Sequence, residues 1–200
     1  MAITYPFNNS LYVNLTNRCL MACTYCIKYK WGGKFYGTDL RLPKEPEAAE
    51  VIAEIKDPTK YHEIIFCGYG EPLVRLDVLK EVAAWVHAHG GRVRINTSGH
   101  ANVFHKRNIV PELAGLVDAI SVSLNATSPR QYNRLNRPQA KKGAFGATIA
   151  FVAECKKYIP SVTVTVVTLP GVDVEKVRAI ADKLGVSFRI RPLIDEETDA

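Results

Sequence analysis

Three of the five cysteines, Cys19, Cys23 and Cys26, fall in one short segment with the spacing C-x3-C-x2-C. Three thiolates on one tight loop can converge on a metal centre. A structural zinc site usually takes four protein ligands, and no fourth Cys or His lies at zinc spacing nearby. A four-iron iron–sulfur cluster also normally takes four cysteines, so three would leave one iron with an open position. The spacing therefore predicts either an iron–sulfur cluster with an open iron or a zinc loop.

A second candidate site is the segment Gly68-Tyr69-Gly70-Glu71-Pro72. Two glycines permit a backbone with positive φ or a close approach of the main chain to a ligand. Exposed amides and the Glu71 carboxylate could then meet a carboxylate and an ammonium group of that ligand. Taken alone, the segment is also compatible with a simple turn that contains two glycines.

Composition favours one ordinary globular domain over residues 1–200, with 47% hydrophobic residues. We expect no membrane span and no secretion signal. An odd number of cysteines, three of them on one loop, argues against disulfides and for a reducing cytoplasm. Cys67 and Cys155 are expected to be small buried hydrophobic residues. The net charge of +6 includes basic residues near the cysteine loop, which either balance a negative metal centre or are a solvated surface. Nucleic-acid binding is not excluded.

Short apolar runs alternate with amphipathic stretches along the whole chain. The pattern predicts strands at residues 11–16, 63–67, 92–97, 119–124, 162–168 and 188–192. It predicts helices at residues 45–57, 76–89, 103–115, 129–135, 146–158 and 174–184. Such alternation implies parallel strands joined by right-handed crossovers, and six strands are too few for a closed eight-stranded barrel.

Five of these strands alternate apolar and polar residues, whereas a parallel sheet covered on both faces would be almost continuously apolar. One face must therefore pack under the helices, and the other must line a polar cavity. We expect an α/β fold, a partial (β/α)6 open barrel with a parallel sheet. Its polar face carries Tyr12, Asn14, Thr16, Arg94, Asn96, Ser121, Ser123, Asn125, Thr163, Thr165, Arg189 and Arg191.

The motifs and their order resemble the radical SAM superfamily. Its cysteine signature has the spacing found here, usually with an aromatic residue before the last cysteine, here Tyr25. Gly68–Pro72 is similar to the family's GGEP motif, with Tyr69 in place of the second glycine. Later turns are similar too: Asn96-Thr97-Ser98-Gly99, Ser121-Val122-Ser123-Leu124-Asn125, Thr168-Leu169-Pro170-Gly171 and Arg189-Ile190-Arg191-Pro192-Leu193. The likeness covers residues 11 to about 194.

The resemblance implies that Cys19, Cys23 and Cys26 bind a [4Fe–4S] cluster. It implies that S-adenosylmethionine (SAM) is cleaved to a 5′-deoxyadenosyl radical, which abstracts hydrogen from a substrate. The residues implied at the cofactor are Tyr25, Gly68, Tyr69, Gly70, Glu71, Asn96, Ser121, Ser123 and Asn125. A flavodoxin-like or ferredoxin-like protein would supply the electron. No residue of the chain is assigned a catalytic role.

The substrate stays open. The sequence resembles the short TatD-associated radical SAM proteins, and glycyl-radical-enzyme activases and 7-carboxy-7-deazaguanine synthases are alternatives. A metal-binding structural or interaction module without catalysis is the alternative of another class. A small molecule, a protein and RNA are the three candidate classes of substrate. Arg189 and Arg191 alternate onto the polar face, so we expect an anionic group there, unless Asp195, Glu196 or the SAM carboxylate pairs with them.

Overall fold

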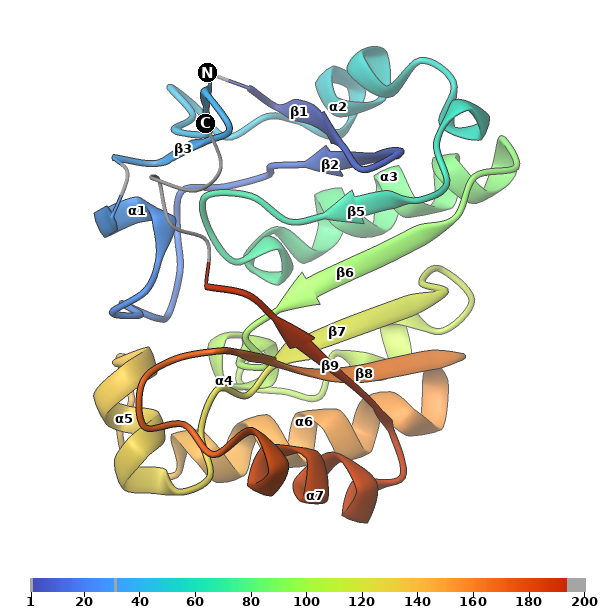
Figure 1. The fold of residues 1–200 in the computed structure, drawn as a ribbon. Coiled ribbons are helices and arrows are strands. Elements are labelled where there is room, and N and C mark those ends of the chain that lie inside the picture. The colour runs from blue at the N-terminus through green and yellow to red at the C-terminus, as the bar shows by residue number, and fades with distance from the viewer. Residues whose placement is uncertain (1, 31, 194–200) are drawn as a thin grey trace.

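The computed structural model describes residues 2–30 and 32–193. Its main sheet has the strand order β1-β2-β5-β6-β7-β8-β9 (Figure 1). All neighbouring strands are parallel except β1, which pairs antiparallel with β2. The strands are β1 (Thr4–Phe7), β2 (Ser10–Val13), β5 (Ile64–Phe66), β6 (Val93–Thr97), β7 (Ala119–Ser123), β8 (Ser161–Val167) and β9 (Ser187–Arg191). A separate small hairpin pairs β3 (Lys34–Phe35) with β4 (Thr38–Asp39).

Helices follow the strands and cover one face of the sheet (Figure 1). They are α2 (Ala48–Ile55), α3 (Leu76–Ala88), α4 (Ala101–His105), α5 (Pro129–Asn136), α6 (Ala144–Tyr158) and α7 (Val174–Leu184). The short helix α1 (Ile27–Lys30) lies instead beside the β3–β4 hairpin. Between this layer and the sheet lies a core that is fully buried at Phe66, Leu79, Ile95, Ile120 and Val164. No helix in the described part of the chain is both long and apolar enough to cross a membrane.

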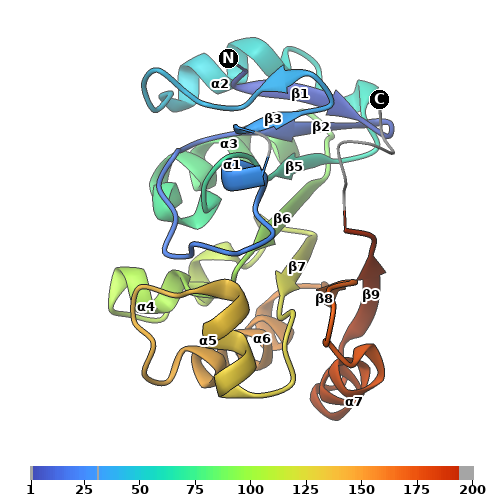
Figure 2. The same cartoon turned by 60° about the vertical axis from the view of Figure 1, so that its left-hand side comes forward.

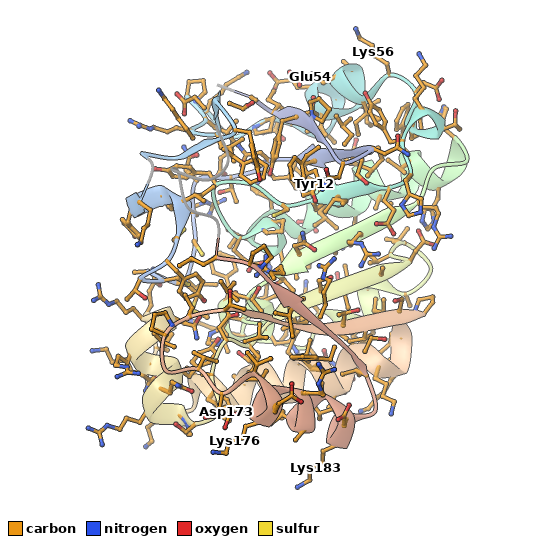
Figure 3. The ribbon with its side chains drawn as sticks, viewed as in Figure 1. Tyr12, Glu54, Lys56, Asp173, Lys176 and Lys183 are labelled. Atoms are coloured by element: carbon orange, nitrogen blue, oxygen red, sulfur yellow. The ribbon has the colours of Figure 1, made fainter. Side chains whose placement is uncertain are left out.

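The sheet is open and strongly curved. Its edges are β1 and β9, and β9 crosses in front of β7 and β8 in Figure 1. The polar side chains expected on one face do lie there: Arg94 and Arg189 both reach the hydroxyl of Ser121, and Arg191 reaches Ser123. Figure 3 places Tyr12 on β2 within the molecule, whereas Lys176 and Lys183 of α7 point outward. We call this face, opposite the helices, the concave face. The α/β, mostly parallel open sheet was thus correctly predicted.

One expected element was wrong, and two elements were not expected. The helix expected at residues 103–115 is interrupted: α4 ends at His105, Lys106 adopts a left-handed conformation with φ 54°, and a 3₁₀ helix, η3 (Val110–Leu113), follows. The side chain of Asn102 accepts a hydrogen bond from the amide of Ile109, at 3.0 Å, which stabilises this bend.

Strand β1 was not expected, because Pro6 is unfavourable in a strand except at an edge, which is where β1 lies. Glu54 of α2 fixes it, accepting hydrogen bonds from the amide and the hydroxyl of Thr4 at 3.1 and 2.9 Å (Figure 3). The β3–β4 hairpin was also missed, since two-residue strands carry no detectable periodicity. Phe35 and Tyr36 of this hairpin pack against Phe7.

Candidate metal and cofactor site

The cysteine loop follows β2 at the carboxyl end of the parallel strands, where α/β folds commonly place their sites. The segment after α5 holds it in place. The amide of Thr24 donates to the carbonyl of Leu135 at 2.9 Å, and the amide of Gln139 donates to the carbonyl of Leu20 at 2.9 Å. Met21 and Pro138 form an isolated bridge between the two segments. Both views show the loop between β2 and α1 reaching toward α5 (Figure 2). Its path is therefore fixed by residues far away in the sequence.

The three thiols of the loop are partly buried. Burial raises the pKa of Cys23 to about 12, and the charges of Cys26 and Cys19 raise it further, which shows that the three thiols lie near one another. Burial also raises the pKa of Cys19 to about 11 and raises that of Cys26. Binding a metal centre requires thiolates, so assembly of a cluster here would release protons.

The donor set, three thiols on one loop, has the chemistry of an iron–sulfur cluster site. In the described ranges, no three His, Cys, Asp or Glu side chains converge on one metal ion. In a four-iron cluster each protein thiolate binds a different iron, so three thiols on one loop could hold three of the four irons. The thiol of Cys23 faces Asn136, with Sγ 3.6 Å from its backbone oxygen.

Tyr25 and Asn125 connect the loop to the middle of the sheet. The side-chain nitrogen of Asn125 donates to the hydroxyl of Tyr25 at 2.6 Å. Its side-chain oxygen accepts a hydrogen bond from the backbone amide of Val167 at 2.8 Å. The Tyr25 hydroxyl also bonds Asn136. Asn125 is fully buried and has φ 52°. Both ends of its side chain are bonded within the chain, so Asn125 positions the cysteine loop.

Gly68 and Gly70 are not needed for positive φ, since neither has it. A Cβ at Gly70 would lie 2.3 Å from the carbonyl oxygen of Arg18 and 2.5 Å from that of Thr16. A Cβ at Gly68 would lie 2.2 Å from the side-chain oxygen of Asn14. The close approach expected at these glycines is thus met by the chain itself: Gly70 gives room to the backbone that enters the cysteine loop.

Glu71 is 3% exposed, and its carboxylate was expected to face a ligand ammonium group. The structure gives it other partners. One oxygen accepts from the hydroxyl of Thr97 at 2.8 Å, and the other accepts from the amide and hydroxyl of Ser98 at 2.8 and 2.7 Å. Burial raises the pKa of Glu71, and these hydrogen bonds oppose that shift. Glu71 therefore anchors the turn that follows β6.

Tyr69 also contacts other residues of the chain through both its backbone and its ring. Its amide donates to the side-chain oxygen of Asn14 at 3.0 Å, and the side-chain nitrogen of Asn14 donates to the carbonyl of Leu40 at 2.6 Å. Lys28 stands over the Tyr69 ring, 4.5 Å from its centroid. Asn14 thus joins the glycine loop to the segment before α2.

The remaining expected cofactor residues lie on the concave face. Asn96 and Ser121 are register partners on β6 and β7. The side-chain oxygen of Asn96 is buried and has no hydrogen-bond partner in the described structure, which leaves one acceptor for a ligand. Ser121 and Ser123 accept hydrogen bonds from arginines.

Sequence reasoning missed two residues that shape this site, Glu45 and Asn136, and it placed Asn14 on the polar face without giving it a role at the site. Glu45 accepts both Arg18 Nε and Arg18 Nη2 at 2.7 Å and so holds the residue before Cys19. Asn14 and Asn136 are buried polar residues at the ends of a strand and a helix. Their only signal in the sequence is an amide side chain at such an end, which is too common to single out a site.

Comparison with known proteins gives a family. Residues 13–184 match the model described as "Radical SAM superfamily". A GTP 3′,8-cyclase from Corynebacterium glutamicum is 30% identical over 166 residues, which cover 82% of this chain and 42% of the relative. A dual-specificity RNA methyltransferase from Geobacter sulfurreducens is 28% identical over 140 residues, covering 64% of this chain and 34% of the relative. The chain thus spans less than half the length of these curated relatives.

Solved structures have the same fold. The structure titled "Native anSMEcpe with bound AdoMet" matches with a TM-score of 0.67 at 15% identity, over 92% of this chain and 51% of the other. A radical SAM methyltransferase from Sphaerobacter thermophilus matches with a TM-score of 0.56 at 16% identity, over 94% and 68%. The match to the family model covers most of the sequence, so the chain belongs to the radical SAM superfamily.

Proposed function

We propose that this protein abstracts a hydrogen atom from its substrate with a radical made from SAM. Enzymes of the superfamily use a [4Fe–4S] cluster and SAM. The observation that carries the proposal is the position of the three neighbouring thiols, on a loop fixed at the carboxyl end of the sheet beside the polar concave face. Cys19, Cys23 and Cys26 would hold the cluster. When bound, the cluster supplies the electron that cleaves the S–C5′ bond of SAM.

The chain's own residues bind and orient. Tyr25 and Asn125 hold the cysteine loop against β7 and β8. Glu71 holds the Thr97–Ser98 turn, directly beyond Asn96, whose free oxygen can accept a hydrogen bond from SAM. Because the helices cover only the opposite face, substrate can approach from the concave side. The reductant in this proposal is a flavodoxin-like or ferredoxin-like protein of the cytoplasm.

Anaerobic reconstitution with iron and sulfide, followed by SAM and dithionite, tests the proposal. The wild-type protein should become brown, carry about four irons per chain as a four-iron cluster requires, and release 5′-deoxyadenosine. Cys155→Ala is the matched control, because Cys155 is a fully buried thiol of α6 outside the loop. It should behave like the wild type. A colourless protein with one zinc would reject the proposal in favour of a structural metal module.

A further inference from the structure

The concave face holds more positive than negative charge. Glu63 forms a two-point ion pair with Arg94, its oxygens accepting Nε at 2.7 Å and Nη2 at 2.8 Å. This neutralises Arg94. Within the part of the chain that the structure describes, neither Arg189 nor Arg191 has an ion-pair partner. Among the described residues, the guanidinium groups at these two alternate positions of β9 therefore have no carboxylate in direct contact.

Serine hydroxyls satisfy only a few of the hydrogen-bond donors of these two guanidinium groups. Arg189 donates one hydrogen bond of 3.4 Å to Ser121, a hydroxyl that it shares with Arg94. Arg191 donates one of 3.1 Å to Ser123, and its Nε is buried without a partner among the described residues. A guanidinium group carries five N–H donors in a planar fork, so most donors of this pair have no partner among the described residues.

These charges also repel one another. Arg94 and Arg189 share the hydroxyl of Ser121, and Arg191 bonds the hydroxyl of Ser123, two residues along β7. Partial burial, together with the charges of Arg191 and Arg94, lowers the pKa of Arg189. Arg189 is exposed and Arg191 is half-buried. Like charges held side by side repel one another, and an anion that bridges them removes this repulsion. Planar guanidinium forks match the oxygens of a phosphate group in pairs.

Arg191 also lies near the cysteine loop. The side chain of Asn125 donates a hydrogen bond to the hydroxyl of Tyr25, which lies on that loop. Arg191 is the register partner of Val167, whose amide bonds Asn125. An anion on Arg191 would thus lie next to the residues that position the loop, and the rest of its molecule could reach the radical.

We propose that the substrate is a small molecule bearing a phosphate or a phosphate chain, which Arg189 and Arg191 bind on the concave face. This substrate class deepens the proposed function and rests on it. A dianionic phosphate or a phosphate chain balances both charges, whereas the single carboxylate of SAM balances one. Asp195 and Glu196, which follow β9, lie outside the described residues, so the test must separate them from a substrate.

Pyrophosphate is the probe, with binding measured by calorimetry on the reconstituted protein. We expect wild-type protein to bind it, and Arg189→Gln and Arg191→Gln each to weaken binding at least tenfold. Arg191→Lys keeps the charge and loses the fork, so its loss should be smaller than that of Arg191→Gln. Arg130→Gln removes an equal charge from an exposed position of α5 and should change binding less than twofold. Circular dichroism checks that each variant is folded.

Three results would overturn the substrate assignment. One is equal binding by Arg189→Gln, Arg191→Gln and Arg130→Gln. Another is loss of pyrophosphate binding when SAM is saturating, which would assign the arginines to the SAM carboxylate. The third is binding only after Asp195→Asn and Glu196→Gln are combined, which would make the chain's own acidic residues the partner. The binding assay involves no turnover, so absence of 5′-deoxyadenosine from the wild type rejects the proposed function separately.

Discussion

The side chain of Asn125 donates a 2.6 Å hydrogen bond to the hydroxyl of Tyr25. Tyr25 belongs to the cysteine loop, where it directly precedes Cys26. The Asn125 side chain also accepts the amide of Val167 at 2.8 Å. One buried amide thus joins the cysteine loop, the end of β7 and the end of β8. Asn125 can do this because its left-handed backbone, φ 52°, turns the chain at the end of β7. Asn tolerates that conformation better than most residues.

Asn125→Ala should therefore destabilise the protein. It leaves the Val167 amide buried without an acceptor, which costs about 1–3 kcal/mol of unfolding free energy. Asn125→Gly is the matched variant, because it also loses both hydrogen bonds but relieves the strain of a Cβ at positive φ. It should be about 1 kcal/mol more stable than Asn125→Ala. Urea unfolding measures both. Equal stability of Asn125→Ala and wild type would mean that the side-chain bonds contribute nothing.

Tyr25→Phe tests the other end of that contact. It keeps the ring and removes the hydroxyl that accepts from Asn125 and bonds Asn136. We expect the free energy of unfolding to fall by about 1 kcal/mol. In a double-mutant cycle with Asn125→Ala, we expect a coupling free energy of about 0.5–3 kcal/mol. Tyr158→Phe, on an exposed tyrosine of α6, is the control. Strict additivity of Tyr25→Phe and Asn125→Ala would show that the two side chains act independently.

The cysteine assignment predicts a sharp division among the five thiols. Cys19→Ala, Cys23→Ala and Cys26→Ala should each lose the visible absorbance and the iron of the reconstituted protein. Cys67→Ala and Cys155→Ala should keep both, because these thiols lie outside the loop. Iron analysis and absorbance spectra of anaerobic samples measure this. Full four-iron content in any of the first three variants would defeat the assignment of that cysteine.

Gly70→Ala should damage the cysteine loop itself. The added Cβ would lie 2.3 and 2.5 Å from two carbonyl oxygens of the loop backbone, which cannot move like the end of a flexible side chain. We expect a stability loss of more than 1 kcal/mol together with reduced iron content. Gly146→Ala is the control: it lies in α6 with open space around its Cβ position, and alanine there should stabilise by about 0.5–1 kcal/mol. Normal iron content and stability in Gly70→Ala would show that the loop adapts easily.

The sequence predicted most of the sheet because strands such as β6 and β7 alternate in polarity, and this local signal survives folding. It predicted the cysteine loop because a ligand spacing is also local. What it could not predict are partners far along the chain. Tyr25 and Asn136, for example, are 111 positions apart. Nothing near Gly70 in the sequence shows that its missing side chain makes room for Arg18, and nothing near Glu71 shows that Ser98 takes its carboxylate.

Lowering the pH should break the ion pair between Glu45 and Arg18, the residue directly before Cys19. Hydrogen bonds from Arg18, with further help from Thr16 and Arg75, lower the pKa of Glu45 from 4.5 to about 2. A carboxyl group whose pKa is lower in the folded than in the unfolded protein stabilises the folded state. This stabilisation is fully present above the pKa of the unfolded state, and it is lost as the pH falls through the pKa of the folded state. The advantage of wild-type protein over Glu45→Gln should therefore be constant above pH 4.5 and shrink between pH 4.5 and about 2.

The size of this effect is limited by solvent. The Glu45 side chain is 29% exposed and that of Arg18 is 55% exposed, so water screens the pair and we expect about 1 kcal/mol. Urea unfolding of the metal-free protein at several pH values measures it, with subtraction of Glu45→Gln removing the titration of the other carboxylates. Arg18→Gln should lose a large part of the same pH-dependent difference, because Arg18 makes the largest contribution to the shift. If the difference between wild type and Glu45→Gln stays the same as the pH falls from 4.5 to about 2, the ion pair does not stabilise the entry to the cysteine loop.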